Sequence, residues 1–357
     1  MKRQFGIDLI RTIAIIFVLV VHCFLNIEFY NQSYIGISTY CLLLIRNIAF
    51  VCVPLFLILT GYCMADKKLE KGYFSKIIKI IIVYLLISII SLLYKIFYLN
   101  EPFTIHQIID IFTFKLNGYS WYVEMYIGLF LIIPFLNIIY ENLYSKNHKR
   151  VLFIVLAIIT TLPLTFSDIH IEYLNLNIFP SYWRTLYPIL YYYIGCYIKE
   201  YKPSNNKIVY ILIFISTLLI ESTIVFYMGY GNPIILNSIS KYGSIFAIVL
   251  AVLVFLLFYK TKIHGNIMRK AFEIIANNTL GIYLFSFIYD NLFYGLIHFK
   301  GSYGIQAIKS LVLIVPLVFI CSLISSILLN ELIKLFKKLI KLIKEKHKKN
   351  NLKKTYY

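Results

Sequence analysis

Residues 5–26 read FGIDLIRTIAIIFVLVVHCFLN, an apolar stretch interrupted by three ionisable side chains, Asp8, Arg11 and His22. An α-helix turns by about 100° and rises by about 1.5 Å per residue, so Arg11 and His22 differ by only about 20° around the axis. Asp8 lies about 40° to the other side of His22. Ionisable groups on a membrane helix usually face the protein interior or a watery cavity. The stretch therefore predicts a membrane helix with one polar face, on which His22 lies about 16 Å above Arg11.

A signal anchor with a histidine buried against its neighbours would be a simpler interpretation of this stretch. A cleaved signal peptide needs a site of small residues after the apolar run, and the residues that follow His22 are large. We therefore expect the helix to remain part of the protein.

The composition predicts an all-α, polytopic transmembrane helix bundle. The chain has 357 residues, of which 60% are hydrophobic and 14% charged, and apolar runs of about 20 residues, enough to cross a bilayer, recur along its length. About ten spanning helices are predicted, over residues 9–29, 40–63, 76–98, 122–143, 150–167, 184–199, 207–228, 241–260, 274–297 and 307–331.

The basic residues predict the orientation of these helices. The net charge is +19, and Lys and Arg gather at the N-terminus and in alternate loops, for example five lysines within residues 67–79. Such alternation encodes membrane topology and is not a sign of nucleic-acid binding. We expect both termini in the cytoplasm and the segments 99–121 and 168–183 outside.

Two regions are predicted along the chain, a transmembrane domain over residues 1–331 and a basic tail over residues 332–357. Apolar residues recur in the tail at helical spacing, with lysines on the other faces. This pattern predicts an amphipathic helix that binds the lipids of the anionic inner leaflet. A solvated tail that only sets the topology is the alternative.

No metal site is predicted. The six cysteines are scattered without the spacing of zinc ligands or of a disulfide framework, and the seven histidines form no HExxH pair.

Given the predicted orientation, Arg11 lies near the cytoplasmic end of its helix and His22 in the outer half of the membrane. Other ionisable side chains in the predicted spans also lie toward the outside, and these are Arg46, Glu124, Arg184, Glu221 and Asp290. Each has a structural alternative, since the arginines can extend to lipid headgroups and the acids can pair with polar neighbours. Clustered at one depth, they also fit a site that opens outward.

Four segments carry a resemblance to a known family. They are DLIRTIAIIFVLVVH (8–22), with Arg and His separated by ten residues, CVPLFLILTGY (52–62), SWYVEMYIGLFLIIPFLN (120–137) and TLGIYLFSF (279–287). Together they resemble acyltransferase family 3, a family of membrane acyltransferases. The chain departs from the family pattern at Ser286, where the family often has histidine.

The resemblance implies a multi-pass protein of the bacterial plasma membrane that transfers an acyl group from cytoplasmic acyl-coenzyme A. The acceptor would be a sugar hydroxyl of a cell-surface glycan or of its lipid-linked precursor. No bound cofactor is implied, because acyl-coenzyme A is a co-substrate. Acetyl-coenzyme A is the expected donor, and succinyl transfer is the alternative because Arg46 or Arg184 could hold a free carboxylate. An extra esterase-like domain, present in some members, is not expected because the chain ends soon after the tenth predicted helix.

Chemistry and resemblance together predict the roles of the site residues. Arg11, with Asp8 beside it, would bind the phosphates of the donor, since arginine offers a rigid fork of donors. His22 would act as general base on the acceptor hydroxyl, and Glu124 would orient its imidazole or hold the acceptor. The residues expected to bind the acceptor or to support the site are Trp121, Tyr122, Arg46, Arg184, Glu221, Asp290 and Ser286.

Three other functions compete with acyl transfer. A transporter or flippase of lipid-linked sugars would explain the intramembrane charges, but not a deep histidine above a single arginine. A polysaccharide polymerase or glycosyltransferase usually needs a large outer loop with acids or arginines, and the predicted loops are short. A sensor or assembly partner without catalysis is the third alternative.

Overall fold

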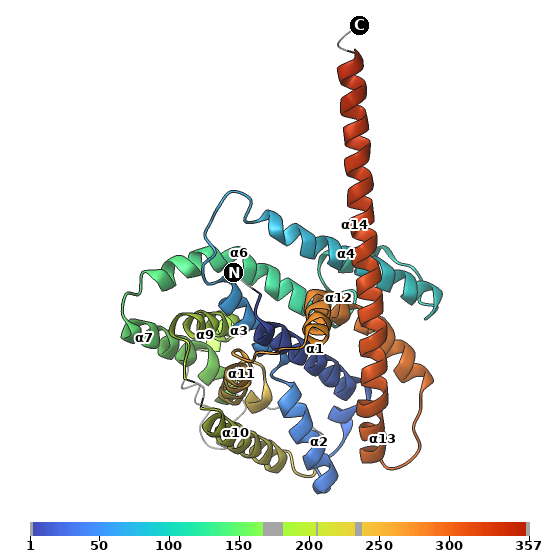
Figure 1. Cartoon of the computed structure of the whole chain (residues 1–357). Helices are drawn as coiled ribbons and strands as arrows, with labels where there is room; N and C mark the ends of the chain where they lie inside the picture. The colour runs from blue at the N-terminus through green and yellow to red at the C-terminus, as the bar shows by residue number, and fades with distance from the viewer. Residues whose placement is uncertain (1–2, 167–180, 205, 233–237, 355–357) are drawn as a thin grey trace.

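A computed structural model gives the fold of the chain and describes residues 3–166, 181–204, 206–232 and 238–354 (Figure 1). These residues form helices and the turns between them, and they contain no strand beyond an isolated bridge between Tyr34 and Tyr230. The all-α prediction is confirmed. Most of the predicted outer segment 168–183 lies outside the described residues.

The helices follow one another along the chain as α1 (Phe5–Asn26), η1 (Phe29–Asn31), α2 (Gly36–Ala49), α3 (Cys52–Met64), α4 (Ser75–Phe97), α5 (Ile105–Phe112), α6 (Trp121–Glu141), α7 (Lys146–Leu156), η2 (Ala157–Thr161), α8 (Leu162–Phe166), η3 (Ser181–Leu186), α9 (Tyr187–Tyr201), α10 (Lys207–Met228), η4 (Ser238–Ser240), α11 (Ile245–Phe258), α12 (Asn266–Leu296), α13 (Tyr303–Lys309), η5 (Ser310–Ile314) and α14 (Val315–Lys354).

Eight helical segments within the described ranges are long and apolar enough to cross a membrane. The chain is therefore a multi-pass membrane protein. Two of the ten predicted spans, 184–199 and 241–260, correspond to the shorter helices α9 and α11, of 15 and 14 residues. Because about 20 residues are needed to span the apolar core, the number ten remains a prediction, as does the side on which the termini lie.

Prolines explain three irregularities in the helices. A proline lacks the N–H that would bond to the carbonyl four residues earlier, and its ring collides with that carbonyl. Pro54 lies in the first turn of α3, and the predicted span 40–63 is accordingly divided into α2 and α3 at residues 50–51. Pro163 and Pro316 follow the wider π-helical turns η2 and η5.

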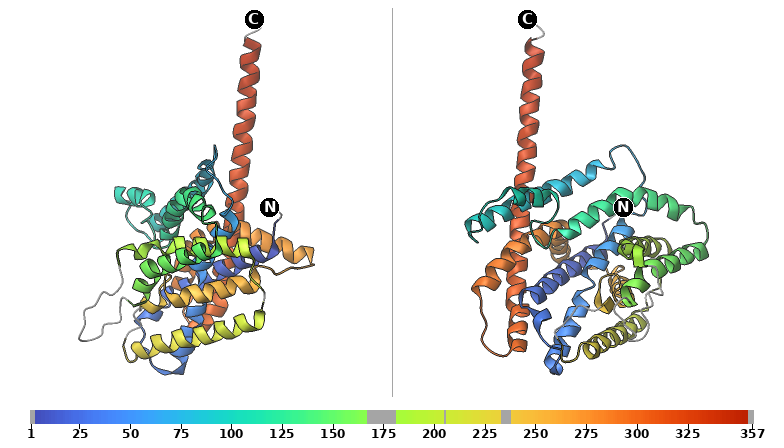
Figure 2. Two further views of the ribbon diagram at one scale, coloured as in Figure 1. Left: turned by 90° about the vertical axis from the view of Figure 1, so that its left-hand side faces the viewer. Right: turned by 180° about the vertical axis from the view of Figure 1, so that it is seen from behind.

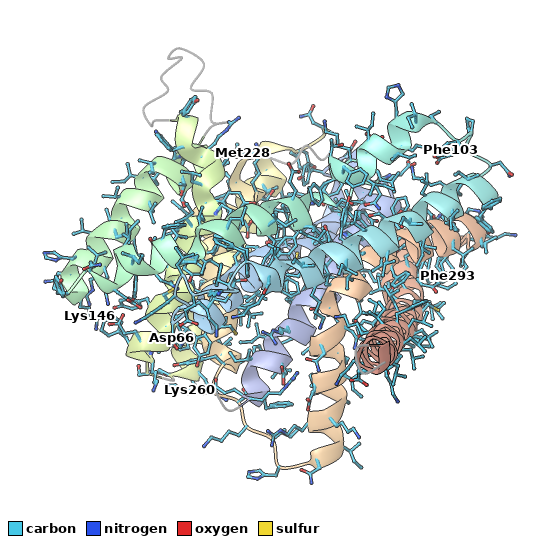
Figure 3. All side chains as sticks on the ribbon, turned by 90° about the horizontal axis from the view of Figure 1, so that it is seen from above. Asp66, Phe103, Lys146, Met228, Lys260 and Phe293 are labelled. Carbon is cyan, nitrogen blue, oxygen red and sulfur yellow. The ribbon has the colours of Figure 1, made fainter. Side chains whose placement is uncertain are left out.

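Helix α1 lies near the centre of the bundle and packs against α2, α3, α11, α12 and α14 (Figures 1 and 2). Asp66, Lys146 and Lys260 lie on one side of the molecule, whereas Phe103 and Met228 lie on the opposite side (Figure 3).

The C-terminal helix α14 runs without a break from Val315 to Lys354 and extends well beyond the bundle (Figures 1 and 2). The predicted boundary at residue 331 is therefore not a break in the helix. Near the bundle, Ser326 and Asn330 of α14 both donate hydrogen bonds to Asn278 Oδ1 of α12. Binding of the tail to the inner leaflet remains a prediction.

Two glycines, Gly61 of α3 and Gly195 of α9, face each other and allow the backbones of these two helices to approach closely. A Cβ atom at Gly61 would overlap the carbonyl oxygen of Tyr192, and one at Gly195 would overlap that of Ile58. Both obstacles are backbone atoms, so neither can rotate away. Gly61 belongs to the segment 52–62, whose α3 also forms one wall of the site described below.

Gly61→Ala should therefore destabilise the protein by about 1–3 kcal/mol, because the added methyl group forces α3 and α9 apart. Gly128→Ala is the matched control, since Gly128 of α6 has open space where its Cβ would lie and alanine favours a helix. The measurement is the melting temperature of each of the two variants in detergent. Equal melting temperatures for the two variants would contradict the close approach.

The orientation is tested by cysteine labelling in a background without the native cysteines. Lys115→Cys, in the segment between α5 and α6, should react with a membrane-impermeant maleimide from outside, because the basic loops are expected in the cytoplasm. Lys68→Cys should react only after the membrane is opened. Both lysines are exposed, so the reverse labelling pattern would overturn the predicted orientation.

Candidate active site

A cavity of about 320 Å³ lies between α1, α3, α6 and α12. One end is lined by Arg11 and Cys63, and the other by His22, Trp121 and Tyr283. The expectation that Arg11 and His22 share one polar face is confirmed, because both side chains line this cavity. Asp8, the third polar residue of the face, is buried and does not line it.

The imidazole of His22 is held from α12. Its Nδ1 lies 3.3 Å from Ser286 Oγ and 3.5 Å from Asp290 Oδ2. Ser286 and Asp290 are four positions apart, so they lie on the same face of α12. Asp290 is only 2% exposed. Because Ser286 stands where the family often has histidine, a hydroxyl group and not a second imidazole lies beside His22.

The hydrogen bonds around His22 fix its tautomer. Ser286 Oγ donates its proton to the carbonyl oxygen of Tyr283 at 2.7 Å, which leaves Oγ as an acceptor toward Nδ1. The Asp290 carboxylate is also an acceptor. Nδ1 therefore carries the hydrogen, and the lone pair is on Nε2. In the described part of the chain Nε2 makes no hydrogen bond, and it is the ring nitrogen left for the cavity.

Tyr119 supports this arrangement from the segment between α5 and α6. Its ring stacks on the imidazole of His22 with centroids 3.7 Å apart and an interplanar angle of 20°. Its hydroxyl group donates to Asp290 Oδ2 at 2.9 Å and accepts from Asn26 Nδ2 at 3.2 Å. The backbone carbonyl of Tyr119 in turn accepts from the Tyr283 hydroxyl. Tyr119 therefore holds both His22 and its carboxylate partner.

Sequence reasoning named Glu124 to orient the imidazole or to hold the acceptor, and the structure has a different carboxylate, that of Asp290, beside the ring. Glu124 is exposed on α6 and does not line the cavity. Asp290, which was expected only to support the site, occupies the position beside the imidazole. The helical period explains the difference. Tyr122 and Tyr126 of α6 are four positions apart and both line the cavity, whereas Glu124 is two positions from each, about 200° around the axis, and points away from it.

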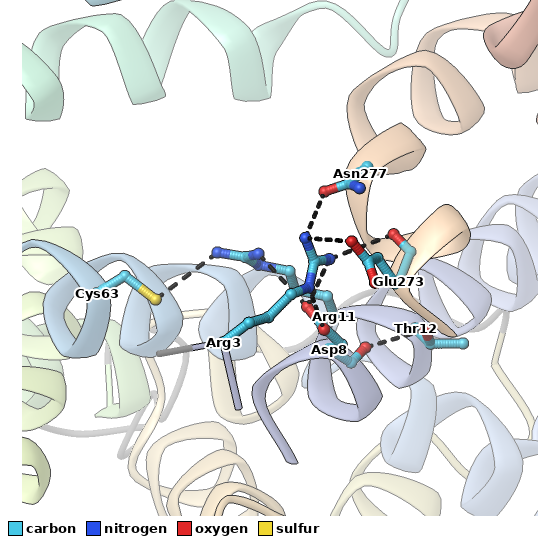
Figure 4. A network of polar contacts seen from close by, with 7 residues as sticks. All are labelled: Arg3, Asp8, Arg11, Thr12, Cys63, Glu273 and Asn277. Atoms are coloured by element: carbon cyan, nitrogen blue, oxygen red, sulfur yellow. Dashed lines mark hydrogen bonds and ion pairs between the residues drawn. The ribbon is translucent and has the colours of Figure 1, made fainter. Parts of the chain in front are cut away.

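The opposite end of the cavity carries a network of charged groups (Figure 4). Arg3 Nε and Nη2 lie 2.6 and 3.0 Å from the two carboxylate oxygens of Asp8. Arg11 is more distant, with Nη1 3.8 Å from Asp8, and its Nη2 donates to Cys63 Sγ at 3.6 Å. Asp8 is therefore paired with Arg3, and the guanidinium of Arg11 stays on the cavity wall.

Arg46 does not extend to the headgroups, as one alternative had it, but is buried with 1% of its surface exposed. Its guanidinium lies 3.7 Å from the ring centroid of Phe50. The Phe50 ring stacks on Tyr242 with centroids 4.0 Å apart, and Tyr242 stacks on Trp121 at 5.7 Å. Arg46 thus supports an aromatic stack whose last two members, Tyr242 and Trp121, line the cavity.

The two remaining charged candidates also lie away from the cavity. Glu221 is buried in α10, and its Oε2 has no hydrogen-bond partner among the described residues. Arg184 is exposed in η3. The structure therefore brings together Arg11, His22, Trp121 and Tyr122 in one cavity, with Ser286 and Asp290 behind the imidazole.

Sequence reasoning missed Tyr119, Tyr242 and Arg3. No spacing in the sequence links residue 119 to residues 22 and 290, because the three belong to different segments. The described ranges contain no group of three His, Cys, Asp or Glu side chains that could hold a metal ion.

Comparison with known proteins gives one match. A family model for acyltransferase family 3, described as an acyltransferase domain, matches residues 4–331 of the chain. Neither a search of curated proteins nor a search of solved structures found a match.

Proposed function

The chain belongs to acyltransferase family 3, and on that premise we propose that it transfers a small acyl group from cytoplasmic acyl-coenzyme A to a sugar hydroxyl. The acceptor is a cell-surface glycan or its lipid-linked precursor, and the membrane is the bacterial plasma membrane. The observation that carries the proposal is that Arg11 and a tautomerically fixed His22 line the same cavity. A flippase has no need of a histidine with a fixed tautomer on the wall of such a cavity.

Arg11 is suited to the phosphate groups of the donor. A guanidinium presents several donors in a rigid fork that matches phosphate oxygens. The wall between Arg11 and His22 is largely apolar, with Val18, Leu59 and Leu280 among its residues, as the slender pantetheine arm requires. With a rise of about 16 Å along α1 between the two residues, a donor held at Arg11 would have its thioester near the imidazole.

The surroundings of His22 favour an acetyl group over a succinyl group. Among the described residues that line the cavity, Arg11 is the only Lys or Arg side chain. Arg46 and Arg184, the two residues considered for a free carboxylate, do not reach it. A succinyl carboxylate would therefore be buried beside Trp121, Tyr122 and Tyr283 without a cation, which costs several kcal/mol.

The chemical step follows from the free lone pair of His22. The acceptor hydroxyl gives its proton to Nε2 while its oxygen attacks the thioester carbonyl carbon. The new C–O bond forms, the C–S bond breaks, and the proton passes from the imidazolium to the leaving thiolate of coenzyme A. Asp290 stabilises the imidazolium through Nδ1–H, as the acid of a catalytic triad does. Transfer through an acyl-histidine would use the same nitrogen as nucleophile.

The aromatic stack supplies a surface for the acceptor. Trp121 is 37% exposed and rests on Tyr242, so one side of its ring is supported and part of the rest is accessible. The C–H groups of a sugar ring pack well against such a flat aromatic surface. The hydroxyl to be acylated would then lie between this surface and Nε2.

His22→Gln should lower the transfer rate by about 10² to 10⁴-fold, because an amide can form hydrogen bonds but cannot take up the proton. His106→Gln is the matched control, since His106 is exposed on α5 outside the cavity. The measurement is release of free coenzyme A from acetyl-coenzyme A by the purified protein, together with mass spectrometry of surface glycans with and without the gene. Near-normal transfer by a well-folded His22→Gln protein would refute the catalytic assignment.

A second pair of variants compares the two carboxylates. Asp290→Asn should lower the rate by about 10² to 10⁴-fold, because the amide removes the negative charge that stabilises the imidazolium. Glu124→Gln makes the same chemical change on an exposed side chain and should have little effect. The same assay applies, and a larger loss in Glu124→Gln than in Asp290→Asn would return the orienting role to Glu124.

A further inference from the structure

The Asp8 carboxylate has two arginines within reach. Asp8 is 3% exposed, and a buried carboxylate requires a nearby positive charge. Arg11 stands three positions further along α1, a spacing at which oppositely charged side chains commonly pair. Without another cation nearby, Asp8 and Arg11 would be expected to form an ion pair with each other.

Arg3 takes the place of Arg11 as that partner. It approaches Asp8 with two nitrogens, at 2.6 and 3.0 Å, whereas the nearest nitrogen of Arg11 is 3.8 Å away. The position of Arg3 is fixed from α12, where it donates to Asn277 Oδ1 at 3.1 Å and to the Glu273 carbonyl oxygen at 3.3 Å (Figure 4). The Asp8 carboxylate is therefore engaged by Arg3 on both oxygens.

The remaining contacts of Arg11 are weak. Its hydrogen bond goes to Cys63 Sγ at 3.6 Å, and a thiol sulfur is a poor acceptor. The positive charge of Arg11 consequently faces the cavity without a closely bound carboxylate. An anion that enters this end of the cavity does not have to displace Asp8 from Arg11.

We propose that Arg3 is a positioning residue of the donor site, which engages Asp8 and so keeps the Arg11 guanidinium available to the phosphate groups of acyl-coenzyme A. The inference rests on the proposed function. When Arg3 is absent, Arg11 is the remaining cation close to Asp8 among the described residues, and a shift of about 1 Å closes that ion pair. The phosphate groups then compete with a carboxylate for the same guanidinium.

The test is a double-mutant comparison of the full-length protein. Arg3→Gln should raise the KM for acetyl-coenzyme A on the order of tenfold, as expected when a charge-assisted hydrogen bond is lost, and should leave kcat nearly unchanged. Arg3→Gln combined with Asp8→Asn should bring KM back to within about twofold of the wild type. Arg3→Lys should lie between the wild type and Arg3→Gln, since lysine keeps the charge but not the fork.

The controls separate this role from simple stability. Glu273→Gln removes an exposed ion pair of Arg3 but leaves the contact with Asp8, so its KM should stay near the wild-type value. Binding of coenzyme A measured by calorimetry, together with the melting temperature, shows whether each variant is folded.

Two results would overturn the inference about Arg3 and leave the proposed function standing. One is an unchanged KM in Arg3→Gln, and the other is a double variant as impaired as Arg3→Gln, which would mean that Arg3 contacts the donor itself or only supports the fold. A wild-type protein that binds no coenzyme A would instead overturn the proposed function, and the inference with it.

Discussion

The contact between α1 and α12 is the interaction on which the site depends. It brings His22 against Ser286 and Asp290, and at the other end of the cavity it brings Arg3 against Asn277 and Glu273. One pair of packed helices thus determines both the tautomer of the imidazole and the distribution of charge around Arg11. Because burying an isolated charge is so costly, the register between these two helices is tightly restricted. A shift of α12 by one turn, about 5.4 Å, would separate both sets of partners at once.

The partners of the buried charges explain which side chains are left for chemistry. Asp8 is engaged by Arg3, and Asp290 accepts a hydrogen bond from Tyr119 and faces Nδ1 of His22. The Arg46 guanidinium donates from Nη1 to Asn47 Oδ1 and to the Ser240 carbonyl oxygen and packs on Phe50, while its Nη2 has no hydrogen-bond partner among the described residues. Among the described groups on the cavity wall, the Arg11 guanidinium and Nε2 of His22 are those left without such strong partners. Because Asp8 and Asp290 are engaged by other residues and Arg46 and Glu221 lie away from the cavity, one cation and one imidazole nitrogen remain on the described part of its wall.

The sequence predicts contacts within one helix far better than contacts between helices. Arg11 and His22 could be placed on a common face because a single helical period relates them. The all-α class and the helix positions followed from apolar periodicity, although the division of residues 40–63 and the short α9 and α11 did not. Asp290 and Tyr119 meet the site only through the packing of distant segments, which no spacing in the sequence encodes. Arg3 is only five residues from Asp8, but its position is fixed by Asn277 and Glu273 of the distant α12. Glu124 was favoured because it is close in sequence to Trp121, but rotation around α6 directs it outward.

The break between α2 and α3 has a consequence for the end of the cavity beside His22. Pro54 prevents a continuous helix through residues 50–51, and the Phe50 ring lies there between the Arg46 guanidinium and Tyr242. A guanidinium over an aromatic face is stabilised most where water is excluded, so Arg46 holds Phe50, and through it Tyr242 and Trp121, in fixed planes. The rim beside His22 is consequently rigid, whereas the opposite end contains the weakly bound Arg11. A rigid rim suits the acceptor that we propose, whose hydroxyl must be aligned with Nε2. The proposed donor is long, and one cation at its far end together with apolar contacts along its length is enough to hold it.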